Sequence, residues 1–134
     1  MTEPGTTAQD TLRGDILAMG CDDFVSMADV QGQISRGRLA ESVAERQQLV
    51  VDTVRSLLAD GLVEVGVIPS PNNPGFKTWP GTVDEVMTRF VDRFVGHYDD
   101  RREWEYAIWF NLTAKGQQAS AEVVRKRSDS RAER

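Results

Sequence analysis

The sequence predicts an α+β domain in which several helices surround a small antiparallel sheet. Residues 82–98 carry apolar side chains at spacings of three and four, which is typical of an amphipathic helix. Residues 42–60 form a second well-marked helical segment, and residues 62–68 and 104–112 resemble strands. The chain has 134 residues, of which 40% are hydrophobic and 28% charged. This length and composition predict one globular domain with a substantial core.

Two helices are predicted in the first third of the chain. The first is expected over residues 7–19, where Thr7 and Asp10 have the spacing of a capping box. Residues 22–26 are expected to be extended, and a shorter second helix is expected over residues 27–34. Two helices therefore precede the better-marked helix over residues 42–60.

The third helix has clear signals at both ends. Ser42 and Glu45 form a capping box, in which each side chain accepts a hydrogen bond from the other residue's backbone N–H. Gly61 can adopt the left-handed conformation that ends a helix, and Leu62 can then fold back onto Leu57. The turn that precedes this helix is expected at residues 36–38.

A helix is predicted between the two strands. The valine-rich strand 62–68 runs into a proline-rich loop at residues 69–75. Thr82 and Glu85 then form another capping box and begin the amphipathic helix 82–98.

The second strand alternates in polarity. One predicted face contains Trp104, Tyr106, Ile108, Phe110 and Leu112. Trp109 belongs to the opposite face. Thr113 is expected to cap a last helix that extends to about Arg127.

The predicted domain occupies residues 7–127, with a flexible N-terminus at residues 1–6 and a disordered polar tail at residues 128–134. The net charge of the chain is −5, but residues 120–134 carry +2, so residues 1–119 carry −7. A body this acidic repels phosphate unless its positive charges gather on one face.

Several protein classes are disfavoured by what the sequence lacks. No apolar run approaches the roughly 20 residues of a membrane helix. The N-terminus has no basic region followed by an apolar one, so a secretory signal is not expected. Cys21 is the only cysteine, which excludes an intrachain disulfide and a cysteine metal cluster. We therefore expect a cytoplasmic protein without a cofactor, a bound metal or a small-molecule substrate.

Three segments resemble winged-helix proteins. They are the helix 42–60, the sequence Asp60-Gly61-Leu62-Val63-Glu64 that follows it, and the sequence Leu112-Thr113-Ala114-Lys115-Gly116 after the last strand. More narrowly, the chain resembles a group of uncharacterised small actinobacterial proteins. That likeness rests on Phe24-Val25 before the second helix and on the turn Gly75-Phe76-Lys77-Thr78-Trp79.

The resemblance spans about residues 10–122 and implies a definite architecture. It implies a winged-helix-like domain with three N-terminal helices, a small antiparallel sheet, an extra helix inserted between the wing strands and a C-terminal helix. The inserted helix 82–98 is a departure, since a wing is ordinarily a short hairpin turn. An enlarged wing of this kind argues against the groove-docking role that wings usually have.

The residues with catalytic potential form no recognisable motif. His97 is the only histidine, and no serine or cysteine motif accompanies it. The acidic neighbours of Cys21 would raise the pKa of a thiol rather than activate it. The Asp22-Asp23 and Asp99-Asp100 pairs lack the spacing of a calcium loop and fit solvated turns. We therefore expect a protein that is not an enzyme.

One function compatible with the predicted fold is transcriptional regulation through DNA binding by the helix 42–60. Its candidate DNA contacts are Arg36, Arg38, Arg46, Gln47 and Gln48. Residues 43–60 nevertheless carry a net charge of −1, and most DNA affinity comes from phosphate contacts. Because of this charge, DNA binding is the less favoured of the two functions considered.

The favoured function is a non-catalytic protein-interaction module. Phe76 and Trp79 lie in or beside the proline-stiffened loop, and Trp109 lies opposite the main apolar face of its strand. Aromatic side chains on rigid surface segments are typical interface anchors. The alternative for each is a structural role, in which Phe76 and Trp79 attach the inserted helix to the sheet and Trp109 packs under that helix. The expected partner is an immunity- or antitoxin-like protein or a second copy of the chain.

Overall fold

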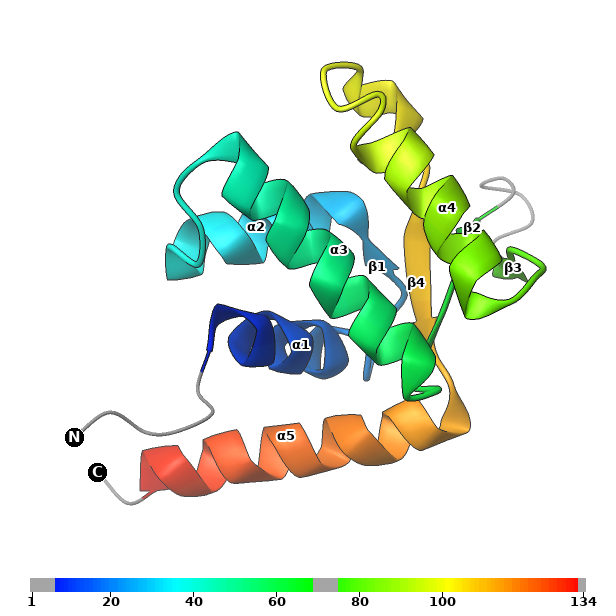
Figure 1. The fold of residues 1–134 in the computed structure, drawn as a ribbon. Helices are drawn as coiled ribbons and strands as arrows, with labels where there is room; N and C mark the ends of the chain where they lie inside the picture. Colours follow the sequence, from blue (N-terminus) through cyan, green and yellow to red (C-terminus); the bar gives the residue numbers. More distant parts are fainter. Residues whose placement is uncertain (1–6, 69–74, 133–134) are drawn as a thin grey trace.

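The structure is a computed structural model and describes residues 7–68 and 75–132, with side-chain surroundings up to residue 129. Within these residues the chain forms five α-helices, one 3-10 helix and four strands (Figure 1). The helices are α1 (Ala8–Met19), α2 (Met27–Gly37), α3 (Val43–Ala59), α4 (Val83–Phe94), η1 (Arg101–Glu103) and α5 (Ala114–Ala132). The strands are β1 (Val25–Ser26), β2 (Val63–Val67), β3 (Lys77–Thr78) and β4 (Trp109–Leu112). The predicted α+β class is confirmed.

The four strands form one antiparallel sheet in the order β1-β4-β2-β3. In the register of the central pair, Val65 lies opposite Phe110 and Gly66 lies opposite Trp109. Val65 and Phe110 are each 1% exposed, so this face of the sheet is the core face. Glu64 belongs to the other face, where its carboxylate accepts a 3.2 Å hydrogen bond from the amide of Asn111.

The helices pack on one another and on the core face of the sheet. Helix α1 contacts α2, α3 and α5, and α4 contacts α3 (Figure 1). Phe90 of α4 lies 6.2 Å from the ring of Phe110, which joins α4 to β4. At the other end of the molecule, the Ser120 hydroxyl donates to the carbonyl oxygen of Leu17, which joins α5 to α1 at 2.6 Å.

Capping boxes begin the first four α-helices. The pairs are Thr7 with Asp10, Ser26 with Asp29, Ser42 with Glu45, and Thr82 with Glu85. Three of them are predicted from the sequence, and the box at Ser26 is an addition. Because each box satisfies backbone N–H groups that a helix leaves unpaired, the helix starts agree closely with prediction.

Two helices end through a residue in the left-handed conformation. Gly61 has a φ of 71°, and the N–H of Leu62 donates to the carbonyl oxygen of Leu57 at 3.0 Å, as predicted for the end of α3. Arg38 has a φ of 51° and gives α2 the same ending, with the N–H of Leu39 donating to the carbonyl oxygen of Ile34 at 3.1 Å. Helix α2 therefore continues to Gly37, three residues beyond its predicted end.

The inserted segment differs from prediction in two places. Helix α4 ends at Phe94 rather than at residue 98, because the chain turns at Gly96, where a Cβ would overlap the carbonyl oxygen of Asp92. Strand β3 is not predicted and pairs with β2 beside Gly66. A Cβ on Gly66 would overlap the carbonyl oxygen of Lys77, so the pairing depends on this glycine.

Strand β4 begins five residues later than predicted. The predicted strand starts at Trp104, but η1 and a turn occupy the segment up to residue 108. Trp104 and Ile108 are both buried and are joined by a 3.2 Å backbone hydrogen bond, which is a helical spacing. Tyr106 is 67% exposed, so the predicted apolar face is interrupted there.

Helix α5 extends to Ala132, whereas the sequence predicts disorder from residue 128. Arg125 forms ion pairs with Glu122 at 2.6 Å and with Asp129 at 4.0 Å, and these i,i+3 and i,i+4 pairs support a longer helix. The predicted flexible N-terminus at residues 1–6, most of the proline-rich loop (residues 69–74), and residues 133–134 lie outside the described residues.

Replacing Arg38 with glycine should stabilise the protein, because glycine adopts a positive φ without the clash of a Cβ. We expect R38G to raise the free energy of unfolding by about 0.5–1 kcal/mol in urea denaturation. The matched control is G61A at the end of α3, which puts a Cβ on a residue with a positive φ. Beyond the adjacent residues of the chain, no atom lies within 4 Å of that Cβ, so the variant tests the backbone conformation alone. G61A should lower the free energy of unfolding by about 1 kcal/mol, and equal stability of R38G and the wild type would contradict the argument.

The capping box of α4 should make stability depend on pH. The backbone N–H of Thr82 donates to the Glu85 carboxylate at 2.9 Å and holds the pKa of Glu85 below its ordinary value of 4.5. A lowered pKa in the folded state gives stability above the unfolded pKa, which is lost as pH falls through the folded value. The Tm difference between the wild type and E85Q should therefore shrink as pH is lowered below 4.5. A difference that does not change with pH would contradict this prediction.

Candidate functional site

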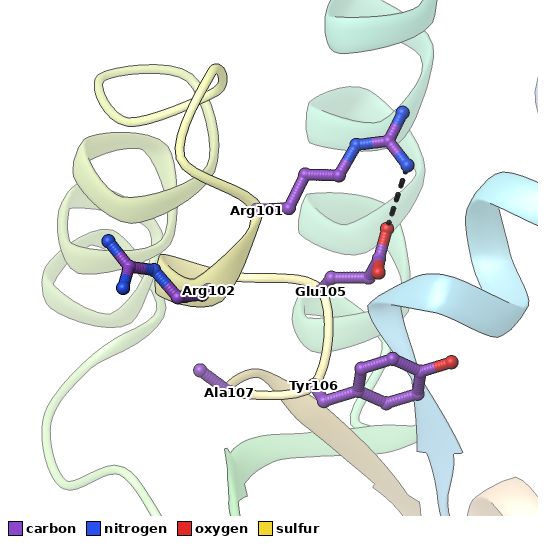
Figure 2. A pocket seen from close by; sticks show the side chains of 5 residues that line it. All are labelled: Arg101, Arg102, Glu105, Tyr106 and Ala107. Carbon is purple, nitrogen blue, oxygen red and sulfur yellow. Dashed lines mark hydrogen bonds and ion pairs between the residues drawn. The ribbon is translucent and has the colours of Figure 1, made fainter.

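Three neighbouring hollows surround the turn at residues 101–107. The first has a volume of about 330 Å³ and is lined by Arg101, Arg102, Glu105, Tyr106 and Ala107 (Figure 2). The second, of about 250 Å³, shares Tyr106 and Ala107 with it and continues along Val67, Ile68, Trp79, Arg89, Arg93 and Trp109. The third, of about 270 Å³, shares Arg101 and Glu105 with the first and continues along Ala28, Gln31, Gly32, Ser35, Arg46, Tyr98 and Trp104. The first hollow thus shares residues with each of the other two, and all three hollows adjoin at the turn.

The composition of this lining differs from that of the whole chain. It includes all three tryptophans and both tyrosines of the sequence. Among the described residues, its charged members are five arginines and one glutamate, whereas the chain has a net charge of −5. We call this set the arginine–aromatic surface: Arg46, Arg89, Arg93, Arg101, Arg102, Trp79, Tyr98, Trp104, Tyr106 and Trp109.

Trp104 anchors the turn that separates the hollows. Its side chain is 2% exposed, and its ring packs edge-on against Phe94 of α4 at 5.0 Å. The ring of Tyr98 stacks on that of Trp104 at 5.4 Å, and the indole N–H of Trp104 donates to the carbonyl oxygen of Tyr98 at 3.1 Å. The turn is therefore held to the end of α4 by packing and by a satisfied hydrogen bond.

Tyr106 is the most exposed aromatic side chain of the surface. It extends from the turn on the same side as Arg101 and Glu105, whereas Arg102 points to the other side (Figure 2). The indole N–H of Trp109 donates to the carbonyl oxygen of Tyr106 at 2.8 Å, and the two rings lie 6.5 Å apart. Trp109 is half-buried, so these two residues offer aromatic area to solvent.

Trp79 is packed beneath α4. It is 5% exposed, and the guanidinium carbon of Arg89 lies 4.3 Å from its ring centroid, which is a cation–π contact. The indole N–H of Trp79 has no hydrogen-bond partner among the described residues. This burial agrees with the structural alternative for Trp79, although the residue also lines the same hollow as Trp109.

Phe76 lies apart from the other two candidate protein-contact residues. It is half-buried, and its ring lies 5.3 Å from the ring of Phe24, which precedes β1. It lines none of the three hollows. The structure thus brings together Trp79 and Trp109 of the predicted contacts and leaves Phe76 in a separate aromatic pair.

Three arginines of the surface form long ion pairs. The shortest distances are 3.5 Å from Arg93 to Glu103, 3.4 Å from Arg101 to Glu105 and 3.2 Å from Arg102 to Asp100. The Arg102 hydrogen bond is the main cause that lowers the pKa of Asp100, and the Asp100 partner raises the pKa of Arg102. Such pairs contribute little to stability because they are solvated.

The candidate DNA contacts are spread over two helices. Arg36 and Arg38 are exposed at the end of α2, and Gln47 is half-buried in α3. Arg46 donates to the hydroxyl of Ser35 at 3.1 Å, and Gln48 donates to the carboxylate of Asp52 at 2.8 Å. Arg46 is the only one of the five that also lines the arginine–aromatic surface.

The other reactive side chains are scattered. His97 lies after α4, with its Nδ1 3.0 Å from the carbonyl oxygen of Asp92. Cys21 is exposed. Across residues 7–68 and 75–132, no three His, Cys, Asp or Glu side chains are grouped so that they could hold a metal ion. No helix in these segments has the length and apolar character needed to cross a membrane.

No sequence motif marks Arg89, Arg93, Arg101, Arg102 or Tyr106 as a candidate contact residue. Arg89 and Arg93 have the i,i+4 spacing that places two side chains on one helix face, and Arg101 and Arg102 are adjacent in a charged turn. These signals are present in the sequence, but only the folded chain joins the two segments around Tyr106.

Comparisons with known proteins found no matching family model, no matching curated protein and no matching solved structure. The function is therefore inferred from the geometry and chemistry of the arginine–aromatic surface.

Two aromatic substitutions in the turn should differ greatly in their effect on stability. W104A removes a buried ring and should lower the free energy of unfolding by about 3–5 kcal/mol. Y106A removes an exposed ring and should change it by no more than about 0.5 kcal/mol. Urea denaturation of both variants checks this prediction, and a large loss in Y106A would show that Tyr106 is a structural residue.

Proposed function

We propose that the protein is a non-catalytic protein-interaction module on a winged-helix-like scaffold. The observation that carries the proposal is the gathering of the solvent-accessible aromatic side chains Tyr106 and Trp109 with five arginines around one turn. Tryptophan, tyrosine and arginine are the residues most enriched at the energetic centres of protein interfaces. A surface with this composition in an acidic chain is well suited to contact another protein.

The order of the elements supports the scaffold part of the proposal. The chain runs α1, β1, α2, α3, β2 and later β4, and β4 lies between β1 and β2 in the sheet. This arrangement fits a winged helix in which β3 and α4 enlarge the wing. Helix α4 brings Arg89 and Arg93 to the hollows, so the enlargement supplies part of the proposed contact surface.

DNA binding through α3 is the second candidate and has weaker support. On the exposed side of α3, Gln48 is bonded to Asp52, and Arg55 forms a 2.8 Å ion pair with Asp84 of α4. Glu45 adds another carboxylate at the start of the same helix. A helix whose exposed face carries acids and paired cations is poorly suited to a phosphate backbone.

The partner we propose is an immunity- or antitoxin-like protein or a second copy of the chain, in the cytoplasm. The two possibilities differ in assembly. A homodimer would be seen as a dimeric solution mass of the purified chain. A different partner would be seen as a second protein that the chain retains from its host.

The test measures the solution mass of the purified chain and the proteins that it retains from its native host. We expect either a dimer or a partner retained at physiological salt, and Y106A/W109A should lose that assembly because the exposed aromatic area of the turn is removed. V124A is the matched control, since Val124 is an exposed apolar residue of α5, outside the hollows.

Two results would contradict the proposal. The first is a strictly monomeric chain that retains no partner. The second is a Y106A/W109A variant that dimerises or retains a partner as well as the wild type does. Retention of DNA at low salt with a steep loss as salt rises would instead support the DNA-binding alternative.

A further inference from the structure

The arginine–aromatic surface has more hydrogen-bond donors than acceptors. Its guanidinium groups carry only donors, and one carboxylate, that of Glu105, lies in the described lining. Only two buried side-chain nitrogens lack a partner among the described residues, and they are Nε2 of Gln31 and Nε1 of Trp79. Both atoms belong to residues that line the hollows, and both are donors. The surface therefore fits a ligand that supplies acceptor oxygens.

Among the arginines that form ion pairs within the described residues, those at the hollows have the longer pairs. Outside the hollows, the shortest ion pairs of Arg13, Arg55, Arg125 and Arg127 measure 2.7, 2.8, 2.6 and 2.9 Å. Those of Arg93, Arg101 and Arg102 measure 3.5, 3.4 and 3.2 Å. Strong charge-assisted hydrogen bonds have lengths of about 2.7–2.9 Å, so the arginines at the hollows retain capacity for a better carboxylate.

Arg89 and Arg102 illustrate this capacity. Arg89 has no ion pair in the described part of the chain, and its guanidinium lies over the ring of Trp79. Arg102 is 92% exposed and holds Asp100 through Nε, which leaves its two terminal nitrogens for a carboxylate. An incoming acid would therefore gain donors without first breaking a tight internal pair.

The same surface offers an apolar position beside the cations. The hollow lined by Trp79 and Trp109 is also bordered by Val67, Ala107, Arg89 and Arg93. Arginine side chains can cover apolar surface with their aliphatic stems. Tyr106 borders both this hollow and the one at Arg101 and Arg102. A segment crossing the turn would therefore meet an aromatic site and a cationic site in succession.

We propose that the arginine–aromatic surface binds an acidic peptide segment of a partner protein. Aspartate or glutamate side chains of that segment pair with Arg101, Arg102 and Arg89, and an apolar side chain packs beside Tyr106 and Trp109. This proposal rests on the protein-interaction function above and adds the chemistry of the partner.

Single-stranded nucleic acid is the competing ligand class for arginines interleaved with aromatic rings. Base stacking along a strand requires several open ring faces. Tyr106 and Trp109 are accessible, but Trp79 and Trp104 are 5% and 2% exposed and Tyr98 stacks on Trp104. The acidity of the whole chain also opposes a ligand with a charge at every nucleotide. The observations therefore favour an acidic peptide with a few local carboxylates.

The test is selection of short random peptides, displayed on phage, against the full chain. Enriched peptides should be rich in Asp and Glu and should contain at least one large apolar residue. Their affinity should fall by at least about tenfold for R101E/R102E, measured by fluorescence anisotropy of the synthetic peptides. R125E/K126E in α5 carries the same charge change away from the hollows and should retain wild-type affinity. Thermal unfolding of both variants verifies that they fold.

The outcomes separate the two proposals. Enriched peptides that are neutral or basic but still require Tyr106 overturn the acidic partner and leave the protein-interaction function in place. If no enriched peptide depends on Tyr106 or Arg101 for binding, both proposals are overturned. Binding of a labelled oligothymidylate that R101E/R102E abolishes, without acidic-peptide binding, overturns the inference in favour of single-stranded nucleic acid.

Discussion

The contact between α4 and the sheet organises the candidate site. Phe90 packs on Phe110 of β4, and Phe94 packs edge-on against Trp104 in the turn. These contacts hold the inserted helix and the segment before β4 in fixed positions, although the two are separate in sequence. Arg89 and Arg93 on α4 therefore line a hollow that adjoins, at Tyr106 and Ala107, the hollow lined by Arg101 and Arg102 of the turn.

The sequence predicts the helix starts well because capping is local. Ser42 with Glu45, and Thr82 with Glu85, lie three residues apart and need no knowledge of the rest of the fold. Strand β3 is missed because its pairing depends on the absence of a side chain at Gly66, eleven or twelve residues away. The late start of β4 is missed for a related reason. Alternating polarity resembles a strand, but the packing of Trp104 on Phe94 holds that segment in a turn.

The candidate site is predicted only in part. Trp79 and Trp109 stand out in sequence as aromatic residues near a rigid loop, and they do line one hollow. The arginines do not stand out, since within residues 89–107 they alternate with a similar number of acids. In the folded chain these side chains point in different directions. The arginines line the hollows, and Glu105 is the only acid of the described residues that lines one of the three hollows. Net charge along the chain therefore says little about the charge of one surface, which side-chain orientation determines.

The placement of the tryptophans has a spectroscopic consequence. Because all three indoles line one surface, the intrinsic tryptophan emission of the chain originates entirely beside the 101–107 turn. The indoles also differ in solvent contact, since Trp109 is half-buried while Trp79 and Trp104 are almost fully buried. A ligand seated at the turn would alter the emission and quenching of Trp109 first. A ligand bound on the distant face of α5 would leave the spectrum unchanged. Intrinsic tryptophan emission therefore reports selectively on binding at the arginine–aromatic surface.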